Sequence, residues 1–541
     1  MVLYFNFILY LFMNWIKNNI LPHFKIAFFL LFPLFFTHSL AWFLKGVLFK
    51  TDVVENVLFA IIVFFLFSVF KTKKWARVFV FALYILALAI EFSYLYLFKS
   101  YINSSSFFIL FQSNLSEISS FFTHFIDFWL VFTWFLLFAI FGFGVRYILN
   151  TANSTFLFKS KFSFILLSIL MVLHFFSPLS KSNFYYNTVT GFLDYKKEKV
   201  AYDAVKFDKI SNAFSNVKHQ NKEEICVLVI GESTSRNHMG IYGYSRNTTP
   251  KLKNLSNEIY AFKNVVTPHT HTLHALEKVL TLGNTQNEDN KFKGTLLQLF
   301  NAAGFKTYWL SNQPPSGLWD NFITGIASSA SETKFINISN DKTPFDGDLL
   351  PYFDSVLKEQ GTKKLIILHL MGTHFLYENR HPKSFSVFKD VPQSIFKSVE
   401  ATKQINAYDN AVMYQDFVWS QIISQLKELD TNASAIFLSD HGEEVYQSIA
   451  YAGHAETKGS KNMYDIPFIV WLSPEKKKDV SHLVFDINRS FSSENLLFAM
   501  SDLANISFTE MQTEWSVFNT AFKPQNRLIF NGQDYDAYFK E

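Results

Sequence analysis

The stretch Ile225-Cys-Val-Leu-Val-Ile-Gly-Glu-Ser233 joins a continuous apolar run to the carboxylate of Glu232. A second stretch, Ala435-Ile-Phe-Leu-Ser-Asp-His-Gly-Glu443, places Asp440 and His441 after its own apolar run. Such runs are typical of buried strands in an α/β sheet, and the ligands of such sheets gather beyond the carboxyl ends of the strands. Oxygen and imidazole donors at two strand ends therefore predict a metal site on one edge of a sheet.

The second half of the chain has the pattern of an α/β domain. From residue 223 onward, short apolar runs alternate with longer amphipathic runs, which predicts a mostly parallel sheet with helices on both faces. The predicted strands are Ile225–Ile230, Thr307–Leu310, Lys364–Leu370, Ala435–Leu438 and Phe468–Trp471, and the predicted helices are Thr295–Ala303, Leu349–Glu359 and Ile405–Leu426. We expect residues 223–541 to form one catalytic domain.

The first half of the chain has the pattern of a membrane domain. Five apolar runs approach the roughly 20 residues that a membrane-crossing helix needs. The runs are Ile26–Leu44, Val53–Phe70, Val78–Phe98, Phe128–Val145 and Phe162–Leu179. We therefore expect residues 1–180 to form a bundle of about five transmembrane helices. Leu3–Trp15 is too short for a crossing and lacks the cleavage site of a signal peptide, so an interfacial helix is expected there.

Basic residues predict how this bundle is oriented. They gather in the second and fourth loops, at Lys71, Lys73, Lys74 and Arg77, and at Arg146, Lys159 and Lys161. Loops rich in lysine and arginine stay in the cytoplasm, so five crossings leave the N-terminus inside and the second half of the chain outside. Residues 181–222 are read as a helical connector that lies partly at the membrane surface, or as a solvated linker.

Charge and cysteine content exclude some classes of function. The formal net charge of +4 is small for 541 residues, and no basic tract interrupts the second half, so nucleic acid is not an expected partner. The single cysteine, Cys226, lies within an apolar strand and has no second cysteine with which to form an internal disulfide. We expect it to serve packing.

The polar residues at the strand ends suit zinc. A tetrahedral catalytic zinc site has three protein ligands and one open position, and Glu232, Asp440 and His441 can supply the three ligands. His374 follows the predicted strand Lys364–Leu370, and His454 lies in Ala452-Gly-His-Ala455. These two histidines are expected to bind phosphate, to hold a second metal ion or to protonate a leaving group.

A nucleophile is expected close to the metal, which would lower the pKa of a bound hydroxyl. The candidate is Thr272, in the stretch Val266-Thr-Pro-His-Thr-His-Thr-Leu-His274 before a predicted helix. A helix N-terminus offers unpaired N–H groups to an anionic phosphate. Thr267 and Thr270 compete with Thr272, and spacing alone does not choose among the three. The histidines at 269, 271 and 274 fit no single ligand set.

Four motifs resemble those of the bacterial phosphoethanolamine transferases, which belong to the alkaline phosphatase and sulfatase superfamily. The motifs are Ile230-Gly-Glu-Ser-Thr-Ser-Arg-Asn-His238, Gly243-Tyr-Ser-Arg-Asn-Thr-Thr-Pro250, Asn406-Ala-Tyr-Asp-Asn410 and Leu438-Ser-Asp-His-Gly-Glu443. The resemblance implies an enzyme of the bacterial inner membrane with a periplasmic catalytic domain. Such an enzyme uses zinc to move phosphoethanolamine from phosphatidylethanolamine onto a threonine, releases diacylglycerol and passes the group to an envelope acceptor.

The resemblance also implies roles for individual residues. The implied zinc ligands are Glu232, Thr272, Asp440 and His441. Thr272 becomes the implied nucleophile, because it follows Asn264-Val265 at the offset found in the family. His374 and His454 match positions that bind phosphate or an additional zinc ion. The implied contacts of the donor headgroup are Ser113, Asn114 and Glu117.

Two departures from the family pattern bear on the acceptor. Pro268 stands where many lipid A-directed members have a cysteine, and a lysine common near the phosphate is absent from Ser311–Gly317. These departures favour the disulfide-poor branch, which modifies lipooligosaccharide core, glucans or surface protein, and they argue against lipid A as the sole acceptor. The expected acceptor is lipooligosaccharide core, lipid A or another periplasmic molecule.

Other functions remain open from the sequence. The alternative is another phospholipid-headgroup transferase, such as a glycerol phosphate transferase, or a phosphodiester hydrolase. A sulfatase is disfavoured, because the Cys/Ser-x-Pro-x-Arg motif of its nucleophile is absent around Thr272. A catalytically silent scaffold is disfavoured by the presence of Glu232, Asp440 and His441 together with Thr272.

Overall fold

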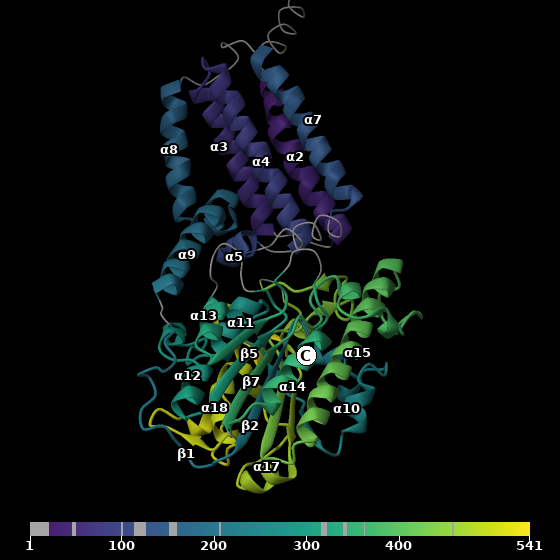
Figure 1. Cartoon of the computed structure of the whole chain (residues 1–541). Coiled ribbons are helices and arrows are strands. Elements are labelled where there is room, and N and C mark those ends of the chain that lie inside the picture. Colours follow the sequence, from purple (N-terminus) through teal and green to yellow (C-terminus); the bar gives the residue numbers. More distant parts are fainter. Residues whose placement is uncertain are drawn as a thin grey trace, which may run out of the picture. The chain divides into compact units, whose positions relative to one another are not determined.

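The chain divides into two compact units, which are seen in a computed structural model (Figure 1). The helical unit comprises Met1–Phe111 and Ile118–Glu198, and the sheet unit comprises Gln112–Glu117 and Lys199–Glu541. The structure describes residues 21–45, 50–98, 101–112, 126–150, 160–204, 207–314, 322–338, 343–361, 363–456 and 459–540. The domain limits expected at residues 180 and 222 stay predictions.

Long apolar helices form the helical unit. The helices in this part of the chain are α2 (Leu21–Lys45), α3 (Lys50–Val69), α4 (Lys74–Phe98), α5 (Ser104–Gln112), α7 (Phe128–Asn150), α8 (Ser160–Phe176) and α9 (Phe184–Ala204). Among the described residues, four of them contain segments long and apolar enough to cross a membrane, judged by length and composition alone: His23–Leu44, Thr51–Val69, Lys74–Leu97 and Phe128–Asn150. These segments overlap the first four predicted runs.

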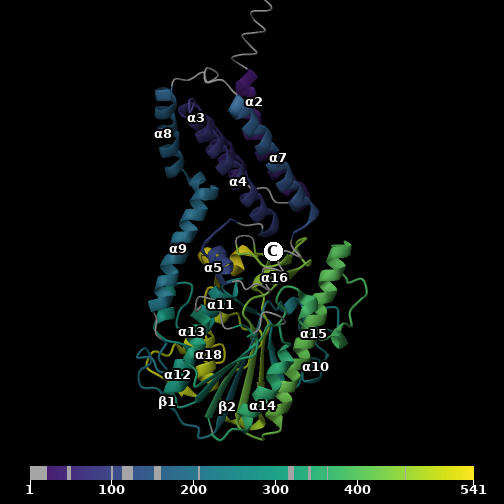
Figure 2. The same ribbon diagram turned by 45° about the horizontal axis from the view of Figure 1, so that its top comes forward.

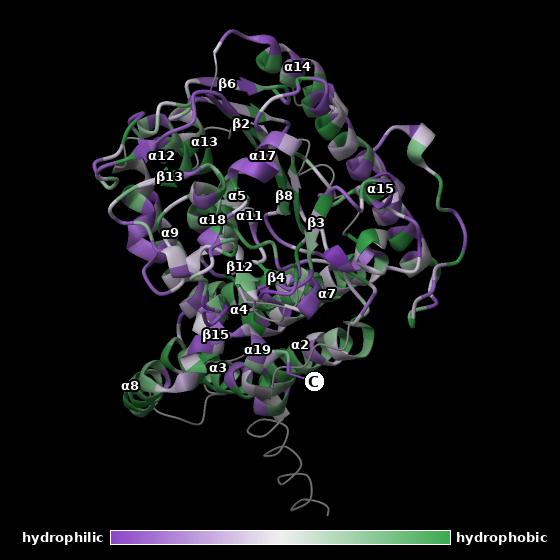
Figure 3. Ribbon diagram, turned by 90° about the horizontal axis from the view of Figure 1, so that it is seen from below, coloured by the Kyte–Doolittle hydropathy of each residue, from purple (hydrophilic) through white to green (hydrophobic). Residues whose placement is uncertain are grey.

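The fifth predicted run, Phe162–Leu179, overlaps α8 (Ser160–Phe176). The 17 described residues of α8 fall below the roughly 20 residues of a membrane crossing. Pro178 opens a 3₁₀ turn two residues after α8 ends, because proline lacks the N–H group that would continue the helix. The expected count of five long helices is therefore not confirmed, although α8 is coloured as mostly hydrophobic (Figure 3). Leu3–Trp15 lies outside the described residues.

The sheet unit is built on seven strands in the order β3-β11-β8-β2-β7-β5-β6. The strands are β2 (Glu224–Gly231), β3 (Ile259–Phe262), β5 (Lys306–Ser311), β6 (Glu332–Phe335), β7 (Lys363–His369), β8 (Ala433–Ser439) and β11 (Phe468–Leu472). The strands from β8 to β6 pair in parallel, whereas β11 pairs antiparallel with both of its neighbours. All five predicted strands are present, and the prediction missed β3 and β6.

Helices cover both faces of this sheet. The helices of the sheet unit are α10 (Pro250–Asn254), α11 (Thr272–Val279), α12 (Leu296–Ala302), α13 (Phe322–Ser328), α14 (Leu350–Lys358), α15 (Val399–Lys427), α16 (Lys461–Tyr464), α17 (Pro474–Asp479), α18 (Leu496–Leu503) and α19 (Tyr535–Tyr538). The views from two directions agree that α14 and α15 lie on one side of the sheet and that α11, α12, α13 and α18 lie on the other (Figure 1, Figure 2). Every residue of β2 is buried between these layers, which explains its unbroken apolar sequence.

Short two-stranded pairings surround the main sheet. The strands concerned are β1 (Lys218–His219), β4 (Val265–Val266), β9 (Glu444–Val445), β10 (Ala452–Gly453), β12 (Phe491–Ser492), β13 (Ile506–Ser507), β14 (Leu528–Ile529) and β15 (Gln533–Asp534). β4 pairs with β12 and leads into α11, whereas β9 and β10 pair just after β8. These short pairings fix the segments that lead from β4 into α11 and from β8 towards His454.

Gly372 allows two strand ends to approach each other closely. It has a φ of +54°, and a Cβ atom there would lie 2.6 Å from the backbone nitrogen and 2.7 Å from the carbonyl oxygen of Glu232. Thr373, the next residue, donates its backbone N–H to the same carbonyl oxygen at 2.9 Å. A glycine at this position therefore lets the segment after β7 lie directly against the segment after β2.

We predict that Gly372→Ala destabilises the protein by more than about 2 kcal/mol, because it adds a backbone clash to the cost of a left-handed conformation. Gly243 is the matched control: it has a φ of +96°, but no atom lies within 4 Å of the position that a Cβ atom would take there. Gly243→Ala should therefore cost only the conformational part, about 1 kcal/mol. Thermal unfolding of the two variants measures the difference, and equal losses of stability would refute the close approach.

Candidate functional site

Two neighbouring strands bring the predicted metal ligands together. β2 and β8 pair in parallel with Gly231 opposite Ser439, so Glu232 and Asp440 leave the sheet at the same level. The backbone N–H of Asp440 also donates to the carbonyl oxygen of Gly231 at 3.0 Å. Both acidic side chains and the imidazole of His441 are fully buried. The register of the sheet thus places three donor groups in one small volume.

The polar atoms of this group lie close to one another. His441 Nε2 is 3.3 Å from Glu232 Oε1 and 3.5 Å from Asp440 Oδ2. Within the part of the chain that the structure describes, Glu232, Asp440 and His441 form one of two sets whose ligand atoms all lie within 4.8 Å of each other. The spacing suits one metal ion held by two carboxylates and one imidazole.

The hydrogen bonds leave the metal-facing atoms of this group without partners. His441 Nδ1 lies 2.8 Å from the carbonyl oxygen of Gly442, which assigns the ring proton to Nδ1 and leaves a lone pair on Nε2. Asp440 Oδ1 accepts the backbone N–H groups of Ser233 at 3.0 Å and of His441 at 2.6 Å. By contrast, Asp440 Oδ2 and His441 Nε2 have no hydrogen-bond partner although both are buried. Buried acceptors without donors fit a bound cation.

The electrostatics of the site also favour a positive charge. Burial, together with the nearby charge of Glu232, raises the pKa of Asp440 to about 6. Burial opposes a charge on His441, but Asp440 and Glu232 outweigh it and raise the pKa of the imidazole to about 10. Without a metal ion the acidic groups therefore hold a second proton on the His441 imidazole, which a bound cation would replace.

Thr272 is the threonine that faces this group. It begins α11, and its hydroxyl donates to the carboxylate of Glu232 at 3.1 and 3.2 Å from the two oxygens. The hydroxyl of Thr267 instead donates to the carbonyl oxygen of Asp440 at 2.7 Å, and the hydroxyl of Thr270 lies 3.5 Å from His271 Nδ1. Among the three threonines, only Thr272 has a hydroxyl that contacts a candidate ligand side chain in the described residues.

His454 lies beside the candidate metal site and is held by Glu443. The ring of His454 is 4.3 Å from that of His441, measured between centroids. His454 Nδ1 lies 2.7 Å from Glu443 Oε2, and the hydroxyl of Tyr377 donates to the other oxygen of Glu443 at 2.7 Å. His441, Glu443 and His454 form the second set of possible ligands in the described part of the chain. The sequence motif that contains Glu443 gave no sign of this role.

His374 belongs to the same neighbourhood. It follows β7 through Gly372, and its buried Nδ1 atom has no hydrogen-bond partner. Burial, and then the positive charges of Arg380, His454 and His441, lower the pKa of His374 well below its usual value. A neutral imidazole at this position can accept a hydrogen bond or ligate a metal ion.

Gln313 was missed by the sequence analysis. It follows β5, and its side-chain amide donates to Glu232 Oε2 at 3.3 Å and to the carbonyl oxygen of Leu370 at 3.1 Å. Gln313 therefore helps to orient Glu232 from a third strand end. The predicted headgroup contacts Ser113, Asn114 and Glu117 lie outside the described residues.

Comparisons with known proteins agree on a family. Residues 225–506 match the family model described as Sulfatase. Phosphoethanolamine transferase EptC of Escherichia coli O18:K1:H7 is 35% identical over 327 residues, which cover 58% of this chain and 56% of that protein. The chain thus spans about half the length of the curated relatives it matches.

Two solved structures are similar. The C-terminal periplasmic domain of Escherichia coli EptC in complex with zinc is 33% identical to this chain, with a TM-score of 0.57. The match covers 60% of this chain and 93% of that domain. The integral membrane protein lipooligosaccharide phosphoethanolamine transferase A of Neisseria meningitidis is 20% identical to this chain, with a TM-score of 0.67. The match covers 94% of this chain and 99% of that protein. The second likeness shows a shared fold: apolar helices followed by an alkaline phosphatase-like domain.

We predict that Asp440→Asn weakens zinc binding at least about tenfold, because the change removes a charged ligand from the candidate site. Asp416→Asn is the matched control, since Asp416 is also buried but caps α10 through the backbone N–H groups of Lys251 and Leu252. Titration of the metal-free protein with zinc measures both affinities. Unchanged zinc affinity in Asp440→Asn would exclude this residue as a ligand.

Proposed function

We propose that this chain, which belongs to the sulfatase family, is a membrane-bound zinc enzyme that transfers phosphoethanolamine from phosphatidylethanolamine to an acceptor of the bacterial envelope. The observation that carries the proposal is the hydrogen bond from the Thr272 hydroxyl to Glu232, beside the unpartnered atoms of Asp440 and His441. A hydroxyl held against a cation site is suited to attack phosphorus. The names of the relatives support phosphoethanolamine as the transferred group.

The proposed reaction consists of two displacements at phosphorus. In the first, Oγ1 of Thr272 forms a bond to the phosphorus atom of the donor lipid, and the bond from phosphorus to the diacylglycerol oxygen breaks. The proton of the Thr272 hydroxyl ends on the diacylglycerol oxygen, and Glu232 orients that hydroxyl for attack. In the second, an acceptor hydroxyl or amine attacks the same phosphorus atom and restores Thr272.

The residues around Thr272 have separate roles in this scheme. The proposed zinc ligands are Glu232, Thr272, Asp440 and His441. Zinc, when bound, lowers the pKa of a coordinated hydroxyl and offsets the charge of the phosphate. His374 and His454 are proposed to bind phosphate oxygens or a second metal ion, since His454 already uses Nδ1 on Glu443 and keeps Nε2 for such a ligand. Ser113, Asn114 and Glu117 are the proposed headgroup contacts.

The proposed topology places the reaction outside the cytoplasm. We count α8 as a fifth crossing, although it is short, because the lysine and arginine residues near the second and fourth loops then both face the cytoplasm. The N-terminus lies in the cytoplasm, and the sheet unit lies in the periplasm beyond a bacterial inner membrane. In this proposal the periplasmic unit is the catalytic domain, a mostly parallel sheet with the catalytic groups at the carboxyl ends of its strands.

The proposed acceptor is lipid A, lipooligosaccharide core or another periplasmic molecule. Phosphoethanolamine adds an ammonium group to an anionic glycolipid and lowers its net negative charge. Because cationic peptides are attracted by that charge, the modification is expected to reduce their binding to the cell surface.

We predict that the protein, incubated with phosphatidylethanolamine and no acceptor, carries phosphoethanolamine on Thr272, as detected by peptide mass spectrometry. Thr272→Ala should abolish the adduct, because it removes the hydroxyl that donates to the Glu232 carboxylate. In the described residues the only other side-chain hydroxyl that donates to this carboxylate is that of Ser233, the next residue along the chain. Thr270→Ala is the matched control and should keep the adduct.

The same experiment separates the alternatives. An adduct formed from phosphatidylglycerol in place of phosphatidylethanolamine would identify a glycerol phosphate transferase. Release of diacylglycerol by the wild-type protein without an adduct would favour a hydrolase or direct transfer. An adduct in Thr272→Ala at the wild-type level would contradict the assignment of the nucleophile.

A further inference from the structure

The helical unit contains buried acidic side chains that the proposed reaction does not use. Asp52 and Glu55 of α3 are fully buried, and Glu91 of α4 is 5% exposed. Ionisable groups inside a membrane domain are costly, and they are usually kept because they bind a cation, a proton or each other. These three carboxylates therefore call for a positive partner within the helical unit.

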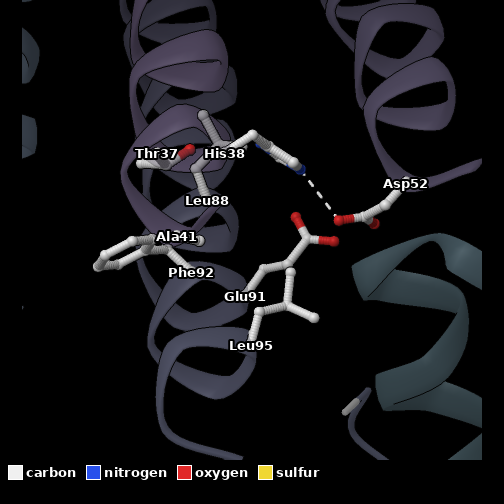
Figure 4. Close-up of a pocket in the computed structure, with 8 residues that line it drawn as sticks. All are labelled: Thr37, His38, Ala41, Asp52, Leu88, Glu91, Phe92 and Leu95. Carbon is white, nitrogen blue, oxygen red and sulfur yellow. Dashed lines mark hydrogen bonds and ion pairs between the residues drawn. The ribbon is translucent and has the colours of Figure 1, made fainter. Parts of the chain in front are cut away.

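Two of these carboxylates line one small cavity. Asp52 and Glu91 line it together with His38, and apolar side chains of Ala41, Leu88 and Phe92 form other parts of its wall (Figure 4). Figure 4 shows the carboxylates of Asp52 and Glu91 pointing towards each other. The cavity leaves room for about one water-sized particle.

The hydrogen bonds around this cavity leave two acceptors unused. His38 Nδ1 lies 2.9 Å from the carbonyl oxygen of Leu34, and Nε2 lies 2.9 Å from Asp52 Oδ2. Asn56 donates its side-chain amide to Glu91 Oε2 at 3.2 Å. The remaining oxygens, Asp52 Oδ1 and Glu91 Oε1, are buried without a hydrogen-bond partner. Each carboxylate of the cavity therefore keeps one oxygen that lacks a donor.

Glu55 lies one turn after Asp52 on α3 but has partners of its own. It accepts the side-chain amide of Asn183 at 2.6 Å and lies 3.5 Å from His174 Nε2. Glu55 does not line the cavity. Its buried carboxylate is therefore a matched comparison for Glu91 in the same helical environment.

The groups that line the cavity favour an ammonium group over a metal ion. In the described residues, sets of three possible metal ligands within 4.8 Å occur only in the sheet unit. A primary ammonium is a compact donor of three hydrogen bonds at about 2.9 Å, so it can donate to the unpartnered oxygens of both Asp52 and Glu91. The cavity has room for the ammonium group itself, and Ala41, Leu88 and Phe92 form an apolar wall beside it.

The cavity lies at one end of the helical unit. His38 is about two turns from the end of α2, Asp52 is in the first turn of α3, and Glu91 is about two turns from the end of α4. Because α2 is followed closely by α3, and α3 by α4, these three positions lie at the same end. In the proposed topology that end faces the outer leaflet, where lipid headgroups lie.

We propose that this cavity binds a primary ammonium group, that of phosphatidylethanolamine, and holds a waiting donor lipid in the outer leaflet, separate from the headgroup contacts proposed for the reaction itself. The identity of the lipid rests on the proposed function, whereas the acceptor atoms belong to the helical unit and are separate from Thr272. The site requires a donor of several N–H bonds, so a trimethylated headgroup does not fit it.

Lipid binding to the full chain tests this site. Native mass spectrometry of the detergent-solubilised protein with equal amounts of phosphatidylethanolamine and phosphatidylcholine should show about tenfold preference for the former, the effect of one charge-assisted hydrogen bond. Glu91→Gln and Asp52→Asn should each lose the preference. Glu55→Gln, the matched control, should keep it.

Other arms of the experiment identify the ligand. Displacement of the bound lipid by free ethanolamine would show that the ammonium alone suffices, and failure of ethanolamine to compete would show that the lipid anchor is needed. Displacement by sodium or calcium ions, but not by ethanolamine, would overturn the ammonium assignment. Equal binding of the two lipids by the wild-type protein, or an unchanged preference in folded Glu91→Gln, would overturn the site itself.

The two proposals fail in different ways. Thr272→Ala should keep the lipid preference while losing the adduct. A wild-type protein that prefers phosphatidylethanolamine but forms no adduct would contradict the proposed function alone. A wild-type protein that forms the adduct but shows no lipid preference would contradict the cavity site alone.

Discussion

The burial of two carboxylates at adjacent strand ends is the constraint on which the rest of the site depends. Glu232 and Asp440 leave β2 and β8 at the same level, and the parallel register of these strands allows no other arrangement. Two buried negative charges so close together need a cation or a proton. The surrounding contacts serve that need: main-chain N–H groups fix one oxygen of Asp440, and the carbonyl oxygen of Gly442 turns His441 so that Nε2 faces the acids.

Much of this arrangement could be predicted from the sequence. Buried strands are recognised as unbroken apolar runs, and the polar residues that follow parallel strands lie at the same edge of the sheet. Thr272 could not be separated from Thr267 and Thr270, since the choice depends on which hydroxyl α11 turns towards Glu232. Gln313 was missed because its contact depends on loop conformation. The antiparallel direction of β11 has no signature in a five-residue apolar run. The end of α8 at Phe176 follows from Pro178, although the apolar run continues to Leu179.

Both units use an imidazole in the same way. His441 and His38 each direct Nδ1 to a main-chain carbonyl oxygen and Nε2 towards carboxylates. The groups around the two rings differ, and so does the expected ligand. In the sheet unit three ligand atoms lie within 4.8 Å of one another, which suits a metal ion, whereas the cavity of the helical unit holds two unpartnered carboxylate oxygens, which suit an ammonium group. The proposed reaction has a use for each: one cation to activate a hydroxyl and one site to recognise a headgroup.

X-ray absorption spectroscopy at the zinc edge of the full chain tests the central claim, that the charges of Glu232 and Asp440 are compensated by a metal ion. The account predicts one tightly bound zinc ion with oxygen and nitrogen ligands only, including one imidazole, and loss of this signal in Glu232→Ala. A zinc ion with a sulfur ligand, or a zinc signal unchanged in Glu232→Ala, would contradict it.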